Sequence, residues 1–294
     1  MRDLTLPIRN RRLLRSLIWG AVLLMTAWMS AAAYGGEPPP FRIGLTTTSL
    51  QHAPGLLTEW QRYMERKLKR RVVFVQRDSY RETMDLLRLN SLDFAWICDY
   101  PYVYLQPLVR LLAVPVYHGR PYNRAYLIVP TTDAGATSIL QLRGRVFAYA
   151  DPYSTTGYLS PRYELRQAKE DPAHFFRKTF FTWSHRRVVE AVASGLAQGG
   201  SVDSYVWDSL ELTQPELTAR TRIVARSAEY GFPPFVAHRA VPAEDRALMQ
   251  RVLFDMALDP EGEQLLKRLN LDGFTLGEPK LYDSVSRMME IVDR

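Results

Sequence analysis

The stretch VFAYADPYSTTGYLSP, residues 146–161, joins a strand pattern directly to a helix pattern. Its first residues are apolar or aromatic as far as Asp151, which is typical of a strand buried on both faces. The residues from about Thr156 to Gln167 have helical character, so a run of hydroxyls lies at the turn between the two elements. A buried strand that leads into a helix is the repeating unit of α/β proteins, and we therefore expect an α/β fold.

The hydroxyl groups of Ser154, Thr155 and Thr156 allow two interpretations. Serine and threonine are preferred N-cap residues, so the run could do no more than begin a helix. The free N–H groups of a helix N-terminus also favour anions, to which hydroxyls add donors and Gly157 allows close approach. The stretch by itself leaves simple capping and anion binding both open.

The alternation of strands and helices continues on both sides of this stretch. Before it, strand and helix patterns follow each other at residues 41–47, 56–68, 71–77, 80–89 and 92–98. This order predicts βαβ units with a mainly parallel sheet.

A second α/β unit follows the first and predicts two lobes, each a mixed sheet flanked by helices. Extended runs at residues 111–117 and 125–130 restart the pattern, and residues 242–294 are helical in period. We expect lobe one to contain residues 41–124 plus 235–294, and lobe two to contain residues 125–234. Ligands of such sheets bind outside the carboxyl ends of the strands. The chain has candidate polar groups there at Thr46 to Ser49, Ser79 and Tyr80, Asp99 to Tyr102, and Asp151 to Thr156.

The first 33 residues predict a secretory signal peptide, followed by a linker at residues 34–40. A basic region with Arg9, Arg11, Arg12 and Arg15 precedes an apolar run and the small residues around Ala33. An uncleaved membrane anchor is the alternative, but the apolar run is short for a span of about 20 residues. We therefore expect cleavage near Ala33 and a periplasmic protein.

The composition excludes several classes of function. The net charge of +7 includes four positive charges from the first 33 residues, so the remainder carries only +3 and its basic residues are dispersed. Nucleic acid is therefore not an expected partner. The single cysteine, Cys98, lies in the apolar run FAWIC and is expected to be a buried thiol. The five histidines show no ligand spacing, so we expect no metal site. We also expect no cofactor and a monomer.

A second segment, TWSHRRVVEAVASG, places His185 at the start of a predicted helix. There the imidazole could donate to the same anion as the hydroxyl run, or it could be a capping or surface residue. Asp203 follows at what looks like another strand end, and it could equally be the N-cap of a helix that begins near Tyr205.

Together these residues resemble the periplasmic substrate-binding proteins of phosphonate, phosphite and phosphate ABC transporters, which have the type 2 periplasmic-binding fold. The family pattern Asp-Pro-x-Ser-Thr-Ser-Gly followed by a proline is matched by residues 151–157 and Pro161, with Thr156 in place of a serine. The family Gly-x-His before an Ala-Val-x-x-Gly helix is matched around His185, with Trp183 in place of the glycine. The segment LDFAWICDYPYV is similar to the family's Asp-x-Ala-Trp strand.

The resemblance implies a small phosphorus oxyanion held between two lobes and delivered to an ABC permease, without covalent chemistry. It implies that Ser154, Thr155, Thr156 and His185 hold the phosphoryl oxygens. It also implies ligand contacts from three further residues, namely Tyr80 from the other lobe, Tyr122 in a loop, and Asp203 as acceptor for a protonated oxygen.

Departures from the family pattern bear on the ligand. Aminophosphonate binders place carboxylates at positions that here fall near Leu210 and at Pro233, so an amine-bearing ligand is not expected. Phosphite, phosphate, methylphosphonate and a larger organophosphonate all stay open.

Two other classes of function compete with transport. The same lobes could present a ligand to a membrane receptor or kinase, because the fold does not fix the partner. An exported serine hydrolase could use Ser154, His185 and Asp151 or Asp203, but the sequence lacks the G-x-S-x-G nucleophile elbow.

Overall fold

The structure is a computed structural model that describes residues 38–46 and 55–292. The predicted signal peptide, most of the predicted linker and the residues from Thr47 to Ser49 lie outside the described residues. From Pro40 onward the chain forms one compact unit. Within the described ranges, no helix is both long and apolar enough to cross a membrane.

The first of two large sheets is mixed and has six strands in the order β13-β4-β12-β3-β1-β2. Strands β1, β2 and β3 are parallel, whereas β4, β12 and β13 each pair antiparallel. The prediction of a mainly parallel sheet is therefore correct for only half of the strands, because β12 and β13 return from distant parts of the chain. The strands are β1 (Phe41–Leu45), β2 (Val72–Gln76), β3 (Phe94–Trp96), β4 (Val109–Val116), β12 (Phe235–His238) and β13 (Gly273–Thr275).

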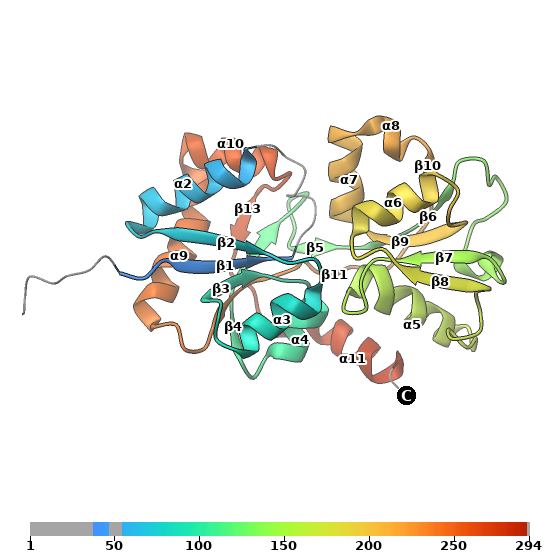
Figure 1. The fold of residues 1–294 in the computed structure, drawn as a ribbon, viewed down its shortest axis with the longest axis horizontal. Coiled ribbons are helices and arrows are strands. Elements are labelled where there is room, and N and C mark those ends of the chain that lie inside the picture. The colour runs from blue at the N-terminus through green and yellow to red at the C-terminus, as the bar shows by residue number, and fades with distance from the viewer. Residues whose placement is uncertain (1–37, 47–54, 293–294) are drawn as a thin grey trace, which may run out of the picture. The chain divides into compact units, whose positions relative to one another are not determined.

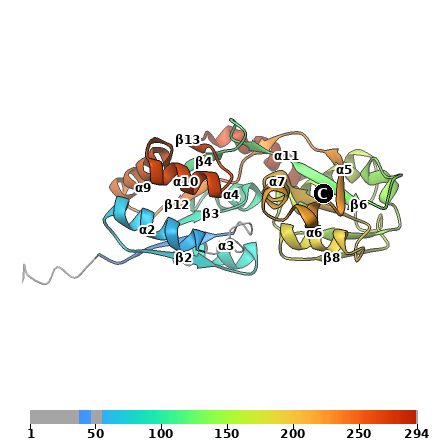
Figure 2. The ribbon, with the colours of Figure 1, turned by 90° about the horizontal axis from the view of Figure 1, so that it is seen from above.

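Alternation along β3 explains why helices cover both faces of this sheet. Phe94 and Trp96 point into the large core cluster with Trp60 of helix α2, whereas Ala95 points to the other side with Met84 of helix α3. A strand buried on both faces must be apolar throughout, which is what the sequence shows. The helices of this part are α2 (Leu56–Leu68), α3 (Tyr80–Arg88), α4 (Asp99–Leu105), α9 (Ala243–Asp255) and α10 (Pro260–Arg268), with α9 and α10 lying near β13 (Figure 2).

The second large sheet has five strands in the order β10-β6-β9-β7-β8. It too is mixed, because β7 pairs parallel with β8 and β9, whereas β6 pairs antiparallel with β9 and β10. Helix α6 lies on one face and α5 on the other (Figure 1). The elements are β6 (Ala125–Pro130), β7 (Val146–Tyr149), β8 (Lys178–Phe181), β9 (Gly199–Asp203), β10 (Thr221–Arg226), α5 (Ser160–Gln167), α6 (His185–Ala193), α7 (Ser204–Thr213) and α8 (Pro215–Thr218).

The two large sheets correspond to the two lobes of the predicted fold. Strand membership changes from the first sheet to the second at Ala125 and back again at Phe235. Between them lies a two-stranded sheet of β5 (Tyr122–Asn123) and β11 (Tyr230–Gly231). The exact lobe boundaries stay a prediction, because the C-terminal helix α11 (Asp283–Val292) contacts both α4 and α5.

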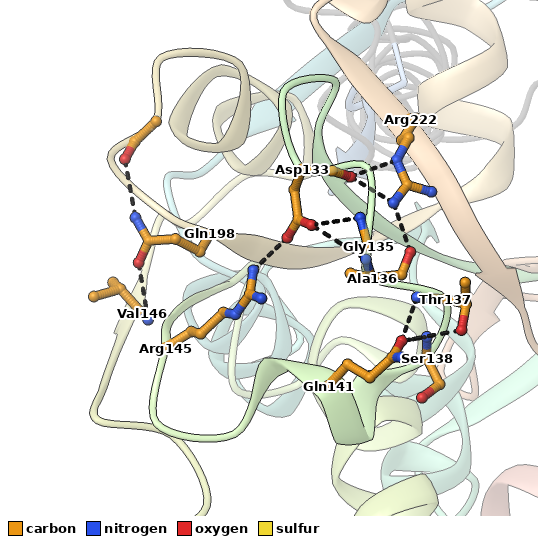
Figure 3. A network of polar contacts seen from close by, with 11 residues as sticks. Asp133, Gly135, Ala136, Thr137, Ser138, Gln141, Arg145, Val146, Gln198 and Arg222 are labelled. Carbon is orange, nitrogen blue, oxygen red and sulfur yellow. Dashed lines mark hydrogen bonds and ion pairs between the residues drawn. The ribbon is translucent and has the colours of Figure 1, made fainter.

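A polar network closes the connection between β6 and β7 (Figure 3). The Asp133 carboxylate accepts from the amides of Gly135 and Ala136 and forms an ion pair with Arg145. The Arg222 guanidinium donates to the carbonyl oxygens of Asp133 and Ala136. Because these contacts satisfy the backbone groups of the connection itself, we interpret the network as structural.

Candidate ligand-binding site

The hydroxyl run forms a helix start, and its three side chains are completely buried. Ser154 is the N-cap, and its Oγ accepts from the Gly157 amide at 2.9 Å. The helix begins with a π-helical turn, η3 (Thr155–Leu159), which continues into α5. Such turns are rare and occur often at functional sites. The run therefore caps a helix, as one interpretation predicted, but three buried hydroxyls are more than capping requires.

His185 lies directly against this helix start. Its Nε2 is 3.1 Å from Ser154 Oγ, and its Nδ1 accepts from the backbone N–H of Asp203 at 3.1 Å. A neutral imidazole has one donor and one acceptor nitrogen, so the contact with an N–H assigns the proton to Nε2. Burial lowers the pKa of His185 to about 3, which keeps the ring neutral. His185 is therefore a fixed N–H donor that points at Ser154.

The donors of this cluster can act together. Ser154 Oγ accepts from both Gly157 N–H and His185 Nε2–H, so its own proton is free to be donated elsewhere. A base at His185 would need an unprotonated Nε2, and the Asp203 amide prevents that tautomer. The arrangement suits the binding of an acceptor and does not suit the activation of Ser154 as a nucleophile.

Gly157 is needed for this close approach. A Cβ at this position would lie 2.5 Å from Ala150 Cβ, 2.8 Å from His185 Cε1 and 3.0 Å from Ser154 Oγ. Since real Cβ atoms do not come that close to other heavy atoms, only glycine lets the histidine reach the helix start.

Asp203 ends β9 and caps α7, and its carboxyl group also reaches the hydroxyl run. Its Oδ1 accepts from the Tyr205 amide at 2.9 Å, and its Oδ2 accepts from Asn123 Nδ2 at 2.5 Å and Thr156 Oγ1 at 3.3 Å. Burial raises the pKa of Asp203 to about 7, and the nearby charge of Asp99 acts in the same direction. The capping role and the proposed ligand role of Asp203 are thus compatible.

Tyr80 comes from the first sheet's side and meets the loop that contains the hydroxyl run. It begins α3, and its amide donates to Asp151 Oδ2 at 3.1 Å. The second oxygen, Asp151 Oδ1, accepts from the Tyr153 amide at 2.8 Å. Asp151 therefore connects the two lobes through backbone amides, a role that the sequence did not reveal.

The structure brings together six of the seven residues selected from the sequence, since Tyr122 has a different environment. The guanidinium of Arg120 lies over its ring at 5.0 Å. Its neighbour Asn123 is the residue that reaches Asp203, and it is almost completely buried. In the sequence, only the offset of that loop from the family pattern indicated that Tyr122 could lie away from the other selected residues.

Asp99 is among the polar groups that the sequence places at strand ends, but neither it nor Cys98 was selected as a ligand contact. Both are buried at the junction of β3 and α4, and Cys98 Sγ lies 2.8 Å from Asp99 Oδ1 and 3.9 Å from Thr155 Oγ1. The prediction of a buried thiol at Cys98 is confirmed, because the side chain is buried and forms no disulfide. The position of Asp99 directly after a strand end is the signal that places it among the candidate polar groups in the sequence.

The backbone conformation of Trp183 explains why the family pattern has a glycine at this position. Its φ is 60°, in the left-handed region that favours glycine. The indole is half-exposed and packs on Phe181, with ring centroids 5.8 Å apart. The backbone turn that precedes His185 is therefore retained here, although a tryptophan in place of glycine makes its left-handed backbone conformation strained.

Comparison with known proteins identifies the family of this chain. Residues 46–282 match the family described as "ABC transporter, phosphonate, periplasmic substrate-binding protein". The chain belongs to this family. Its members are substrate-binding transport proteins, which confirms the prediction of a binding protein rather than an enzyme.

Curated relatives in this family are distant in sequence. A probable ABC transporter phosphite-binding protein, PhnD1, of Prochlorococcus marinus (strain MIT 9301) is 25% identical over 50% of this chain and 52% of the relative. The match thus spans about half the length of that protein. The phosphonates-binding periplasmic protein of Escherichia coli (strain K12) is 21% identical over 88% of this chain and 79% of its own.

Solved structures confirm the two-lobed fold. A binding protein component of an ABC phosphonate transporter from Pseudomonas aeruginosa has a TM-score of 0.80, with 20% identity and 87% of both chains covered. PhnD1 from Prochlorococcus marinus in complex with methylphosphonate has a TM-score of 0.78, with 18% identity, covering 86% of this chain and 98% of the other.

Proposed function

We propose that this protein captures a small phosphorus oxyanion, namely a phosphonate, phosphite or phosphate, between its lobes and delivers it to an ABC permease. The observation that carries the proposal is the buried donor cluster of Ser154, Thr155, Thr156 and His185 at one helix start. Family membership and the methylphosphonate bound by the distant relative PhnD1 support the same ligand class.

The cluster binds an oxyanion through neutral donors. The proton of the Ser154 hydroxyl and the first amides of η3 can donate to a phosphoryl oxygen directly. The Nε2–H of His185 and the hydroxyl of Thr156, which donate to Ser154 and Asp203 in this structure, would exchange these partners for a phosphoryl oxygen when the ligand enters. Neutral donors distribute the ligand charge without adding a permanent cation, so release to a permease does not require an ion pair to break.

We propose that Asp203 accepts a hydrogen bond from a protonated oxygen of the ligand. Its Oδ2 already lies 3.3 Å from Thr156 Oγ1, at the edge of the hydroxyl run. A carboxylate there favours a singly protonated phosphoryl group, because a fully ionised group would present only acceptors to it. Sulfate carries no such proton at neutral pH and is a suitable negative control.

Closure brings lobe one to the ligand through Tyr80 and the loop after β3. The hydrogen bond between the Tyr80 amide and Asp151 joins the lobes beside the hydroxyl run. Movement about the two segments that pass between the lobes, near Ala125 and Phe235, would open and close this contact. We place the mature protein, after cleavage near Ala33, in the periplasm as a monomer.

The competing hydrolase is disfavoured by the tautomer of His185. Ser154 and His185 are within hydrogen-bond distance, as in a catalytic dyad, but the Asp203 amide leaves the Nε2 nitrogen protonated. A sensor that presents the same ligand to a membrane receptor would share this site.

Calorimetric titration of the purified protein tests the proposal. The panel is phosphate, phosphite, methylphosphonate and 2-aminoethylphosphonate, with sulfate as the control anion. We expect micromolar or tighter binding of at least one phosphorus anion, and about a 100-fold loss in the double variant Ser154→Ala/Thr155→Ala, or about 2.7 kcal/mol.

A matched cap variant separates affinity from helix stability. Ser138 caps the short helix η2 (Ile139–Leu142) with a capping box to Gln141, both labelled in Figure 3. Ser138→Ala should lose a comparable cap and keep full affinity. Equal affinity in the wild type and the Ser154/Thr155 double variant would move the ligand site elsewhere.

A further inference from the structure

A buried carboxyl group on the lobe-one side has no place in the proposed head-group site. Asp99 begins α4 directly after β3, and its side chain is completely buried. Its Oδ1 accepts from Cys98 Sγ at 2.8 Å. No described residue donates to its Oδ2, which is also shielded from water. A buried carboxylate oxygen without a donor is costly, so it indicates a missing partner.

Asp99 faces the same space as the hydroxyl run of the other lobe. A hydrogen bond from the Thr155 hydroxyl reaches its carboxyl group, and the adjacent Cys98 Sγ lies 3.9 Å from Thr155 Oγ1. Burial raises the pKa of Asp99 to about 6, while the Cys98 and Thr155 contacts oppose that rise. The charge of Asp99 is in turn the largest electrostatic cause, after burial, of the raised pKa of Asp203. The two carboxyl groups therefore flank one site from opposite lobes.

The two carboxyl groups of this site, Asp99 and Asp203, lack enough hydrogen-bond donors unless the ligand supplies one. Asp99 and Asp203 receive hydrogen bonds from Cys98, Thr155, Thr156, Asn123 and backbone amides. In the described ranges no lysine or arginine donates to either carboxyl group. A phosphoryl group with one P–OH can satisfy Asp203 alone, so a second carboxylate needs a second donor.

We propose that Asp99 is a specificity-determining residue that binds a hydrogen-bond donor on the organic substituent of the phosphorus ligand, with an ammonium group preferred. The inference rests on the proposed function and adds a requirement to it. An ammonium supplies up to three donors and a positive charge between two carboxylates, whereas a hydroxyl supplies one donor and no charge. An alkyl substituent supplies neither and leaves Oδ2 unsatisfied.

The sequence places this carboxyl group among the polar residues at strand ends but assigns it no ligand contact. The family positions for an amine-binding carboxylate fall near Leu210, with Asp208 and Glu211 close by, and at Pro233. Because neither position is itself a carboxylate, the sequence argued against an amine-bearing ligand. Asp99 approaches from the first sheet, at the end of β3, and can serve an amine from the opposite direction.

Three ligands of nearly equal size test the proposal by calorimetry. They are 2-aminoethylphosphonate, 2-hydroxyethylphosphonate and n-propylphosphonate, which differ mainly in the terminal group. For the wild-type protein we expect the amine to bind at least 10-fold more tightly than the propyl compound, with the hydroxyl compound between them. In Asp99→Asn the preference for the amine should fall below 3-fold, with propylphosphonate affinity unchanged or improved.

A second carboxylate provides the matched control. Asp208 is half-buried and bonded to Tyr117 and Tyr126, so Asp208→Asn should leave the ranking of the three ligands unchanged. Loss of the amine preference in Asp208→Asn, or its survival in Asp99→Asn, would overturn the assignment to Asp99. Equal binding of the amine and propyl compounds by the wild type would overturn it without any variant.

Two further outcomes are distinguishable. The ranking compares ligands within one protein, so a smaller active fraction of a variant does not change it. If Asp99→Asn does not fold, Asp99→Glu is the alternative, because it keeps the charge on a longer side chain. An unchanged ranking of the three ligands in Asp99→Glu would contradict a close contact between Asp99 and the terminal group of the ligand. Failure of every phosphorus compound to bind would reject the proposed function itself, because the Asp99 hypothesis concerns only their order.

Discussion

The two sides of the buried site are built in different ways. On the lobe-two side, Ser154, Thr156 and His185 are held by local elements, and their hydrogen bonds define donors and acceptors. On the lobe-one side, Asp99 and Tyr80 reach the site only across the junction of the lobes. The lobe-one side also has an unsatisfied carboxylate oxygen at Asp99.

This difference suggests a division of labour. A helix start with fixed donors recognises the phosphoryl head group, which all candidate ligands share. A carboxyl group from the other lobe, Asp99, contacts the organic substituent, in which the candidate ligands differ. Variants of the two sides should therefore behave differently, since one set should weaken every ligand and the other should reorder them.

The largest expected effect comes from the lobe-two side, with His185→Ala. Loss of the fixed Nε2–H donor should weaken binding of every phosphorus anion about 100-fold, or about 2.7 kcal/mol, without changing their order. The measurement is calorimetric titration, with thermal unfolding to confirm the fold. His185→Gln, which keeps an N–H donor, should recover part of the affinity.

An exposed histidine serves as control for this variant. His174 is mostly exposed and pairs with Asp171, so His174→Ala should bind as the wild type does. A reordering of ligands in His185→Ala would break the proposed division between the two sides.

An intermediate effect is expected in the pH dependence of stability. Folding raises the pKa of Asp203 to about 7, so the folded protein keeps a proton that the unfolded chain loses above about pH 4. Stability from this group is therefore present at low pH and is lost as pH rises from about 4 to 7. Asp203→Asn should gain about 2 kcal/mol relative to wild type between about pH 4.5 and 6, as measured by urea unfolding without ligand.

His185 contributes an opposite pH dependence to the free energy of unfolding, and this contribution cancels when the variant is compared with the wild type. Its pKa is lowered by burial to about 3, so stability from that group falls as pH decreases below about 6.5, equally in both proteins. Asp99→Asn should show the same direction with a smaller amplitude, because the pKa of Asp99 rises only to about 6. A difference between variant and wild type that does not change with pH would contradict the raised pKa of Asp203.

The smallest effect is expected at Trp183, beside the site. Trp183→Gly relieves a left-handed backbone, which costs an ordinary residue about 1–2 kcal/mol, and loses the contact with Phe181. We expect a net gain of at most about 1 kcal/mol in the free energy of unfolding, with ligand affinity unchanged. The control is Leu212→Gly, an exposed apolar residue in the regular helix α7, which should lose about 1 kcal/mol.

Most of the local structure could be predicted from the sequence. The predicted helix from His185 ends two residues earlier than expected, at Ala193, and the strand predicted over residues 92–98 is only Phe94–Trp96. Strand β13 was missed within a tail that reads as helical, because three residues give too little periodicity to detect. The antiparallel partners of β4 were also beyond prediction, since they come from more than 100 residues further along the chain.

The sequence by itself determined the head-group side of the site. Caps, glycines and apolar periods act within a few residues, so Ser154, Gly157 and His185 could be recognised from their neighbours alone. The tertiary structure alone decided the tautomer of His185, the contact of Asn123 with Asp203 and the approach of Asp99 to Thr155. These depend on backbone and side-chain positions 18, 80 and 56 residues apart, which only the closed packing of two sheets brings within hydrogen-bond distance.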